Sequence, residues 1–208
     1  MTIDSQNLLQ SILENLERMD YIKPEDIPGI DLYMDQVTTF MDGQLGSSKR
    51  YEEDKILTKT MINNYAKNDL LPPPEKKKYS KEHILVLIFI YYFKGLLSIN
   101  DIQRLLSPLT EKYFHTDHSL QLAEIYNEVF SLEKEQIEVM KKDLIREYET
   151  ATGTFTDAPG EDQSFLQLFS FICMLSFDVY IKKQVIEKLI DLLPEPEKKV
   201  KKKEKNAE

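Results

Sequence analysis

Residues 58–93 read TKTMINNYAKNDLLPPPEKKKYSKEHILVLIFIYYF, and this stretch decides the fold. Its first part has apolar residues at helical spacing and runs into Pro72–Pro74, which remove three backbone donors and fix φ, so a helix must stop before them. Ser80 has the side chain of an N-cap, and the residues after it are apolar almost all round. We therefore predict a helix, a stiffened turn that carries Lys76–Lys78, and a second helix in the centre of the core.

Helices are also expected in the rest of the chain, because its apolar residues repeat at three and four positions and the sequence contains only 6 glycines. We predict an all-α protein: a winged helix-turn-helix-like helical domain with an N-terminal helix and two long C-terminal helices. The helix before the prolines should cover about residues 54–68, with Asp54 or Thr58 as its N-cap. The other expected helices cover residues 5–20, a segment capped by Asp31, a short segment from Ser98 that closes at Pro108, and residues 120–148 and 165–193.

Four regions follow from this pattern. An N-terminal amphipathic helix and linker occupy residues 1–30, and the domain built around the prolines occupies residues 31–110. Residues 111–193 form a helical C-terminal region whose last helix is unusually rich in aromatic residues, so that we expect it either to be buried on several sides or to pair with a second chain. Residues 194–208 form a Lys-rich tail that we expect to be disordered, because it has no aromatic residue and no apolar period.

Charge is distributed unevenly along the chain. The net charge is −9, which argues against a protein that coats nucleic acid non-specifically. Residues 1–48 carry a net charge of −7, whereas residues 49–81 carry nine basic and five acidic residues, a net charge of +4. A single positive window in an acidic protein attracts phosphate to one face and favours one docking orientation. The alternative is a solvated Lys-rich loop.

Catalytic and metal-binding signals are weak. The sequence has no Gly-rich phosphate loop, no nucleophile elbow and no zinc-ligand spacing, so we expect no enzyme activity, no cofactor and no metal site. His115, Asp117 and His118 suggest a metal site at first sight, but a capping Asp117 with exposed histidines explains them better. Cys173 is the single cysteine and lies among apolar residues, which predicts a packed, inert thiol.

Localisation follows from the apolar runs. The run Ile84–Phe93 is about half the length that a membrane span needs, and no charged leader precedes an apolar stretch with a cleavage site. We therefore expect a cytoplasmic protein that does not associate with a membrane.

The order of motifs around the prolines resembles MerR-type winged helix-turn-helix regulators, in which a Tyr-containing recognition helix is followed by Leu-Leu-Pro-Pro, a basic wing, Tyr-Ser and a helix ending in Ser-x-x-x-Ile. The matching residues in this chain are Tyr65, Leu70, Leu71, Pro72, Pro73, Lys76, Lys77, Lys78, Tyr79, Ser80, Ser98 and Ile102. Residues 31–106 are also similar to a bacterial domain-of-unknown-function family with such a winged helix, whose members are taken to be transcriptional regulators.

The resemblance implies a recognition helix at about residues 54–68 and a short basic wing at residues 72–79. Asn63 stands at the position where MerR-type proteins usually have a phosphate-binding arginine. A helix fits the major groove, where asparagine bonds to adenine and lysines contact phosphates. Tyr79 has the alternative of packing under the wing. The expected DNA-contacting residues are Lys55, Thr58, Lys59, Thr60, Asn63, Asn64, Lys67, Lys76, Lys77, Lys78 and Tyr79.

The sequence thus predicts a sequence-specific transcriptional regulator that binds double-stranded DNA as a homodimer. The alternative is a helical protein-interaction module that uses the aromatic face of residues 165–181 and does not bind nucleic acid. A further hypothesis is that the C-terminal helices enclose a pocket for a small apolar effector.

Overall fold

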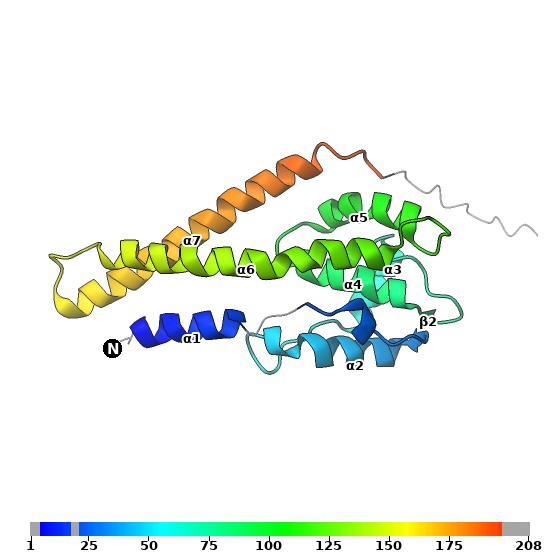
Figure 1. The fold of residues 1–208 in the computed structure, drawn as a ribbon, viewed down its shortest axis with the longest axis horizontal. Helices are drawn as coiled ribbons and strands as arrows, with labels where there is room; N and C mark the ends of the chain where they lie inside the picture. Colours follow the sequence, from blue (N-terminus) through cyan, green and yellow to red (C-terminus); the bar gives the residue numbers. More distant parts are fainter. Residues whose placement is uncertain (1–4, 18–20, 197–208) are drawn as a thin grey trace, which may run out of the picture.

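The computed structural model describes residues 5–17 and 21–196, and within them the chain is helical apart from one small two-stranded sheet (Figure 1). The predicted all-α class is confirmed. The helices are α1 (Ser5–Glu17), α2 (Met34–Leu45), α3 (Lys59–Lys67), α4 (Lys81–Phe93), α5 (Ile99–Tyr113), α6 (Leu122–Thr152) and α7 (Gly160–Ile190), with short 3₁₀ turns η1 (Pro24–Asp26) and η2 (Gly46–Ser48) and strands β1 (Leu32–Tyr33) and β2 (Lys78–Tyr79).

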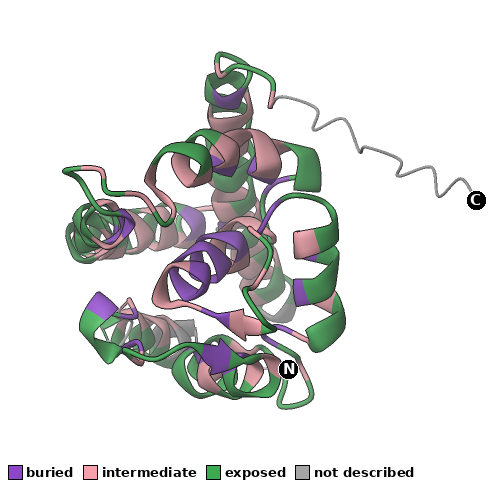
Figure 2. Ribbon diagram, turned by 90° about the vertical axis from the view of Figure 1, so that its right-hand side faces the viewer, coloured by how far each residue is buried: buried purple, intermediate pink, exposed green. Residues whose placement is uncertain are grey.

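Helix α4 is the centre of the core, as its apolar sequence predicts. Every residue from His83 to Ile90 is buried, and Figure 2 shows α4 surrounded by the other elements. Ser80 is its N-cap, and His83 takes the place of the usual Glu or Gln in the capping box, since His83 Nδ1 accepts from the Ser80 backbone N–H at 3.0 Å. The residue that closes this cap is therefore a buried imidazole.

The core continues beyond the predicted limits of 31 and 110. Ile22 and Ile27 are buried on the N-terminal side, and Leu122 and Tyr126 are buried at the start of α6. The Tyr126 hydroxyl donates to the Ile22 carbonyl oxygen at 2.7 Å, which joins the two ends of this body. We call residues 22–130, which contribute to this shared core, the helical body.

Helices α6 and α7 extend away from the helical body as an antiparallel hairpin, with α1 alongside α6 (Figure 1). Glu17 of α1 forms a salt bridge with Lys141 of α6 at 2.7 Å. Tyr148 and Phe171 pack edge to face at 5.6 Å near the hairpin tip. Residues 18–20 of the predicted 5–20 helix, and residues 197–208 of the predicted disordered tail, lie outside the described residues.

Several predicted helix limits were wrong, among them those of α6 and α7, which cover Leu122–Thr152 and Gly160–Ile190 instead of residues 120–148 and 165–193. Helix α3 begins at Lys59 rather than near Asp54, because Thr58 is the cap and Asp54 Oδ2 instead accepts from the Tyr51 N–H at 3.0 Å. Helix α5 continues through Pro108, which lies on its exposed side, where a missing backbone hydrogen bond costs less than in the core. Helix α2 is capped by Tyr33 and not by Asp31.

Candidate nucleic-acid interface

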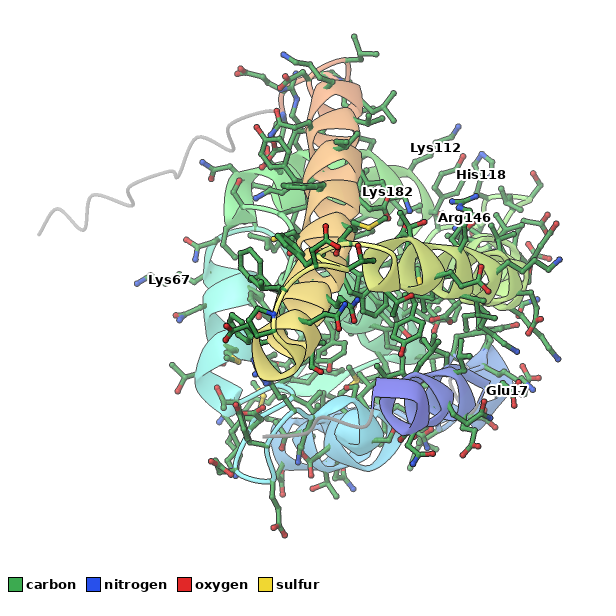
Figure 3. The ribbon with its side chains drawn as sticks, turned by 90° about the vertical axis from the view of Figure 1, so that its left-hand side faces the viewer. Glu17, Lys67, Lys112, His118, Arg146 and Lys182 are labelled. Carbon is green, nitrogen blue, oxygen red and sulfur yellow. The ribbon has the colours of Figure 1, made fainter. Side chains whose placement is uncertain are left out.

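Helix α3 has one buried face and one polar face. Ile62 and Tyr65 are buried, and Met61 is partly buried. The Thr58 hydroxyl accepts from the Met61 N–H at 3.2 Å and so fixes the start of the helix. In Figure 3 Lys67 projects from α3 away from the rest of the molecule. The predicted contact residues that lie exposed on α3 are Lys59, Thr60, Asn63, Asn64 and Lys67.

The turn after the prolines forms a short hairpin. The Lys78 N–H donates to the Glu75 carbonyl oxygen at 2.8 Å. Lys76 and Lys77, the two residues between them, have φ of 48° and 66°. Positive φ at both central positions is typical of a type I′ hairpin turn, which favours Asn-Gly, so two lysines are held here in a strained conformation.

Strand β1 holds the base of this hairpin in place. It pairs antiparallel with β2, with Leu32 opposite Tyr79 and Tyr33 opposite Lys78. The Lys78 ammonium lies 5.3 Å from the centre of the Tyr33 ring. Lys76 and Lys77 at the tip are exposed, whereas Lys78 is partly buried. The sequence therefore predicted the basic turn but missed the strand pairing, because two-residue strands have no detectable apolar alternation.

Tyr79 is a core residue, and the prediction that it contacts DNA was wrong. Its side chain is 3% exposed, and its ring packs edge to face on His83 with the centres 5.5 Å apart. The alternative prediction, that Tyr79 packs under the wing, describes its position. Strand alternation explains this, since neighbouring residues of β2 point to opposite sides and Lys78 has the outer one.

The remaining predicted contact residues lie around α3. Lys55 is exposed in the loop that precedes the helix, and Thr58 is partly buried because its hydroxyl forms the cap. Figure 1 shows α3 and β2 at the same end of the molecule, opposite the tip of the α6–α7 hairpin. Fold and sequence thus bring the helix face and the basic turn to one end.

The exposed lysines of α3 and of the hairpin tip are available to bind an anionic partner. Within the described part of the chain, Lys59, Lys67, Lys76 and Lys77 form no salt bridge. Lys49, which belongs to the same positive window, differs because its ammonium pairs with Asp42 at 2.6 Å. The positive potential of this end therefore comes from α3 and the hairpin tip.

A histidine network that the sequence analysis did not predict supports the base of the hairpin. Burial lowers the pKa of His83, so this imidazole is neutral in the folded protein. Its Nε2 lies 3.4 Å from the Pro73 carbonyl oxygen, and its Nδ1 lies 2.8 Å from the Ser80 hydroxyl. The Ser80 hydroxyl also lies 2.8 Å from His115 Nε2, which is 3.2 Å from Glu82. These contacts tie the proline segment to α4.

The suspected metal ligands do not come together. Among the described residues, no group of three or more histidine, cysteine or acidic side chains has the arrangement of a metal site. His115 contacts Ser80, whereas His118 stacks edge to face on Tyr113 at 5.0 Å. Asp117 is exposed and does not cap α6, whose N-cap is Gln121.

Helix α7 is apolar but largely exposed. The ring of Phe177 is 63% exposed, and Tyr180 and Ile181 are 63% and 60% exposed. The crevice between α6 and α7 near Tyr148 and Phe171 has a volume of only about 40 Å³. The prediction that α7 is buried on several sides within one chain was therefore wrong, whereas its pairing with a second chain is untested.

By length and composition alone, α7 is also a candidate membrane span. Among the described residues it is the single helix that is long and apolar enough, between Asp162 and Ile190, and 6% of its most apolar window is buried. One such helix is weak evidence for a membrane protein. The apolar run Ile84–Phe93, considered above, is shorter and belongs to the buried helix α4.

These features define a helical protein whose body carries a small basic hairpin beside a polar helix face. A family model described as Domain of unknown function (DUF1836) matches residues 22–129, which is more than half of the chain, and the chain belongs to this family. The match covers the helical body from Ile22 to the start of α6. No curated protein and no solved structure matches the chain.

Proposed function

We propose that the protein is a sequence-specific DNA-binding transcriptional regulator of the MerR-type winged helix-turn-helix kind, with α3 as recognition helix and residues 72–79 as a basic wing. The observation that carries this proposal is the exposed polar face of α3 at the same end as Lys76 and Lys77, whose strained turn has no structural need for two lysines.

In this proposal the two elements have different roles. Asn63 and Asn64 lie on the exposed face of α3 and read base edges in the major groove, where asparagine recognises adenine. Lys59 and Lys67 at the two ends of α3, together with the hairpin tip, bind phosphates and set the orientation of the helix. Burial of Ile62 and Tyr65 against the core keeps the helix rigid while it does so.

The test is the salt dependence of binding to a mixed-sequence duplex of about three helical turns. Replacing Lys76 with Asn and Lys77 with Gly removes two charges but keeps residues that favour this turn. We expect the slope of log affinity against log salt to become shallower by about 2 units. Replacing Lys134 and Lys142, two exposed lysines of α6, with Gln is the matched control and should leave the slope unchanged.

Sequence reading has a separate test. Fragments of the source genome that the protein retains are selected, and the affinity for the enriched duplex is compared between the wild type and Asn63→Ala. The variant should lose about 1–3 kcal/mol on the enriched duplex and almost nothing on random DNA. Absence of binding to any duplex at low salt, or equal losses on both duplexes, contradicts the proposal.

The proposed assembly is a homodimer that uses α7. Apolar side chains such as Phe177, Ile181 and Val185 are more than half exposed, and a face of this kind is usually covered by another chain. A two-fold dimer would present two recognition helices to a two-fold operator. Ile181→Glu should shift the protein to a monomer in light scattering, whereas Gln44→Glu on α2 should not.

A second candidate function is a protein-interaction module that holds a different protein on the aromatic face of residues 165–181 and never binds DNA. The exposure of Phe165, Phe169 and Phe177 favours it. The two candidates differ in the duplex experiment, because the module predicts no retained DNA fragment at any salt concentration.

An apolar effector and a cytoplasmic location also remain proposals. The crevice of about 40 Å³ between α6 and α7 is far smaller than the roughly 300–1,000 Å³ of typical ligand sites, so an effector would have to bind the open face of α7 or a dimer interface. Flotation with lipid vesicles tests the expectation that α7 does not enter a membrane, since the cytoplasmic protein should stay in the dense fraction.

A further inference from the structure

His83 lies in the first turn of α4 with both of its ring nitrogens in contact with a partner. Nδ1 accepts from the Ser80 backbone N–H at 3.0 Å and lies 2.8 Å from the Ser80 hydroxyl oxygen. These contacts assign the proton of the neutral ring to Nε2, which lies 3.4 Å from the Pro73 carbonyl oxygen. One uncharged imidazole therefore connects the cap of α4 to the proline segment.

The hairpin and the end of α5 cover this imidazole. The His83 ring packs edge to face on Phe114 with the centres 4.7 Å apart and on Tyr79 with the centres 5.5 Å apart. Its side chain is 1% exposed, so water reaches the ring only when one of these elements moves away. Among the described residues, the titratable and charged groups around the ring are Asp31, Glu75, Tyr79, Glu82 and His115.

Glu82, the acidic residue next to His83 in the sequence, is already paired. Its Oε2 accepts from the His115 backbone N–H at 2.7 Å and lies 3.2 Å from His115 Nε2. His115 has φ of 50°, and its Nε2 lies 2.8 Å from the Ser80 hydroxyl oxygen. The Glu82 carboxylate thus holds His115, and the Ser80 hydroxyl is shared by two imidazoles.

A charged His83 is incompatible with this cap. A proton on Nδ1 turns the acceptor into a donor that faces the Ser80 N–H, so the capping box loses one of its two hydrogen bonds. The charge would also lie in the first turn of α4, at the positive end of the helix dipole. Burial lowers the pKa of His83 more than the Pro73 carbonyl oxygen raises it. The imidazolium is therefore stable only after the chain around the ring has opened.

The hairpin is the weaker of the two elements that cover His83. Strands β1 and β2 have two residues each, whereas α5 is a helix of 15 residues. A two-stranded hairpin is marginally stable at best by itself. Ser80 directly follows β2, so the cap of α4 also anchors the end of the hairpin. Without this anchor, β2 keeps its pairing with β1 and the packing of Tyr79.

We infer that Ser80 and His83 form a pH-sensitive latch, which holds the basic hairpin on α4 at neutral pH and releases it in mild acid while the rest of α4 stays folded. The latch is fully closed above pH of about 6.5, the ordinary pKa of histidine, and weakens as the pH falls toward the lower pKa of the folded protein. Uptake of one proton raises the opening equilibrium by at most about tenfold per pH unit. This device is a property of the hairpin and does not depend on DNA binding.

Amide hydrogen exchange of the full chain tests the latch, with each rate corrected for the intrinsic exchange rate at its pH. The Ser80 amide donates to His83 and the Lys78 amide donates to Glu75, so both report on the hairpin. Between about pH 7.5 and about pH 5 their protection should fall by up to about tenfold per pH unit. Low urea should hardly change it, because a local opening exposes little surface. The Leu87 amide in the middle of α4 should stay better protected and depend on urea.

Two histidine variants make the comparison specific. In His83→Gln the Gln side chain can accept from the Ser80 N–H at every pH, so the protection of the hairpin amides should no longer change with pH. His118→Gln is the matched control, since His118 packs on Tyr113 instead, and it should behave as the wild type does.

Unchanged protection of the Ser80 and Lys78 amides in the wild type overturns the inference, even if His83→Gln does not fold. Exchange of these amides together with Leu87, at the same urea dependence, also overturns it, because protonation would then unfold the whole helical body. The duplex experiment judges the proposed function separately. A protein that loses hairpin protection in acid but binds no duplex has the latch and is not a DNA-binding regulator.

Discussion

Helices α4 and α7 are both rich in apolar residues but have opposite surroundings. In α4, Ile84, Leu87 and Ile88 are each 0% exposed, because elements from both sides of the chain cover it. In α7, Phe177 and Ile181 are 63% and 60% exposed, because α7 packs on α6 near the hairpin tip and on the helical body at its end. Apolar side chains therefore stabilise the helical body in α4 and remain exposed on the surface in α7.

The largest predicted difference between α4 and α7 is the loss in the free energy of unfolding when one apolar side chain of each helix is truncated to Ala. Leu87→Ala leaves a cavity in a filled core and should lower the free energy of unfolding by about 2–5 kcal/mol. Ile181→Ala should change it by less than about 0.5 kcal/mol in dilute protein, because the side chain is already exposed. Urea denaturation at low protein concentration measures both. Equal losses would mean that α7 is covered within a single chain.

A smaller effect is expected where the helical body ends. Tyr126→Phe removes the hydroxyl that donates to the Ile22 carbonyl oxygen and leaves this buried acceptor unpaired. We expect a loss of about 1–3 kcal/mol in the free energy of unfolding. Tyr180→Phe is the control, since its ring is 63% exposed. If Tyr126→Phe lowered the free energy of unfolding as little as the control does, the start of α6 would not unfold together with the rest of the helical body.

The stability of the helical body should also depend on pH through His83. Burial holds the pKa of His83 below the ordinary value of about 6.5, so the unfolded chain takes up a proton at a higher pH than the folded one does. The free energy of unfolding is therefore fully retained above pH of about 6.5 and falls as the pH decreases toward the folded-state pKa.

The variant His83→Gln isolates this effect, because Gln at the third helical position keeps the capping box with Ser80 but does not titrate. Denaturation curves at a series of pH values between neutral and mildly acidic should show a flatter profile for the variant than for the wild type. Parallel profiles would assign the acid sensitivity to another group.

The smallest predicted effect concerns the hairpin tip. Lys77 has φ of 66°, which glycine adopts without a steric penalty. Lys77→Gly should raise the thermal stability of the protein by the equivalent of about 0.5–1 kcal/mol, while Lys67→Gly on α3, where φ is helical, should lower it. A destabilised Lys77→Gly would mean that the lysine side chain itself supports the turn.

Local signals predicted much of the fold. Ser80, Ser98 and Thr58 are N-caps as their sequence contexts indicate, and α3 ends at Lys67, before Pro72–Pro74, as expected. The predictions failed where contacts between residues far apart in the chain outweighed a local sequence signal. Pro108 is a helix breaker by itself, but the helix continues through it, with Ile102 and Leu106 buried in the core before it.

The candidate site was predicted in part. Side chains on α3 follow from helical periodicity, so their exposure was foreseeable from the spacing of Ile62 and Tyr65. Tyr79 was misassigned because its environment depends on β1, which lies more than forty residues away in the sequence. His83 contacts Ser80 through a local capping box three residues long, whereas the contact of His115 with Ser80 depends on how the end of α5 lies against the start of α4.

The amino-acid sequence was sufficient to predict an all-helical chain, the helix that forms the core, and the concentration of positive charge around α3 and the following turn. These properties depend on caps, prolines and apolar periodicity within a few residues. The pairing of β1 with β2, the burial of Tyr79, the exposure of α7 and the contact of Arg104 with Leu193 were seen only in the three-dimensional structure. These depend on contacts between residues far apart in the chain, which local propensities do not encode.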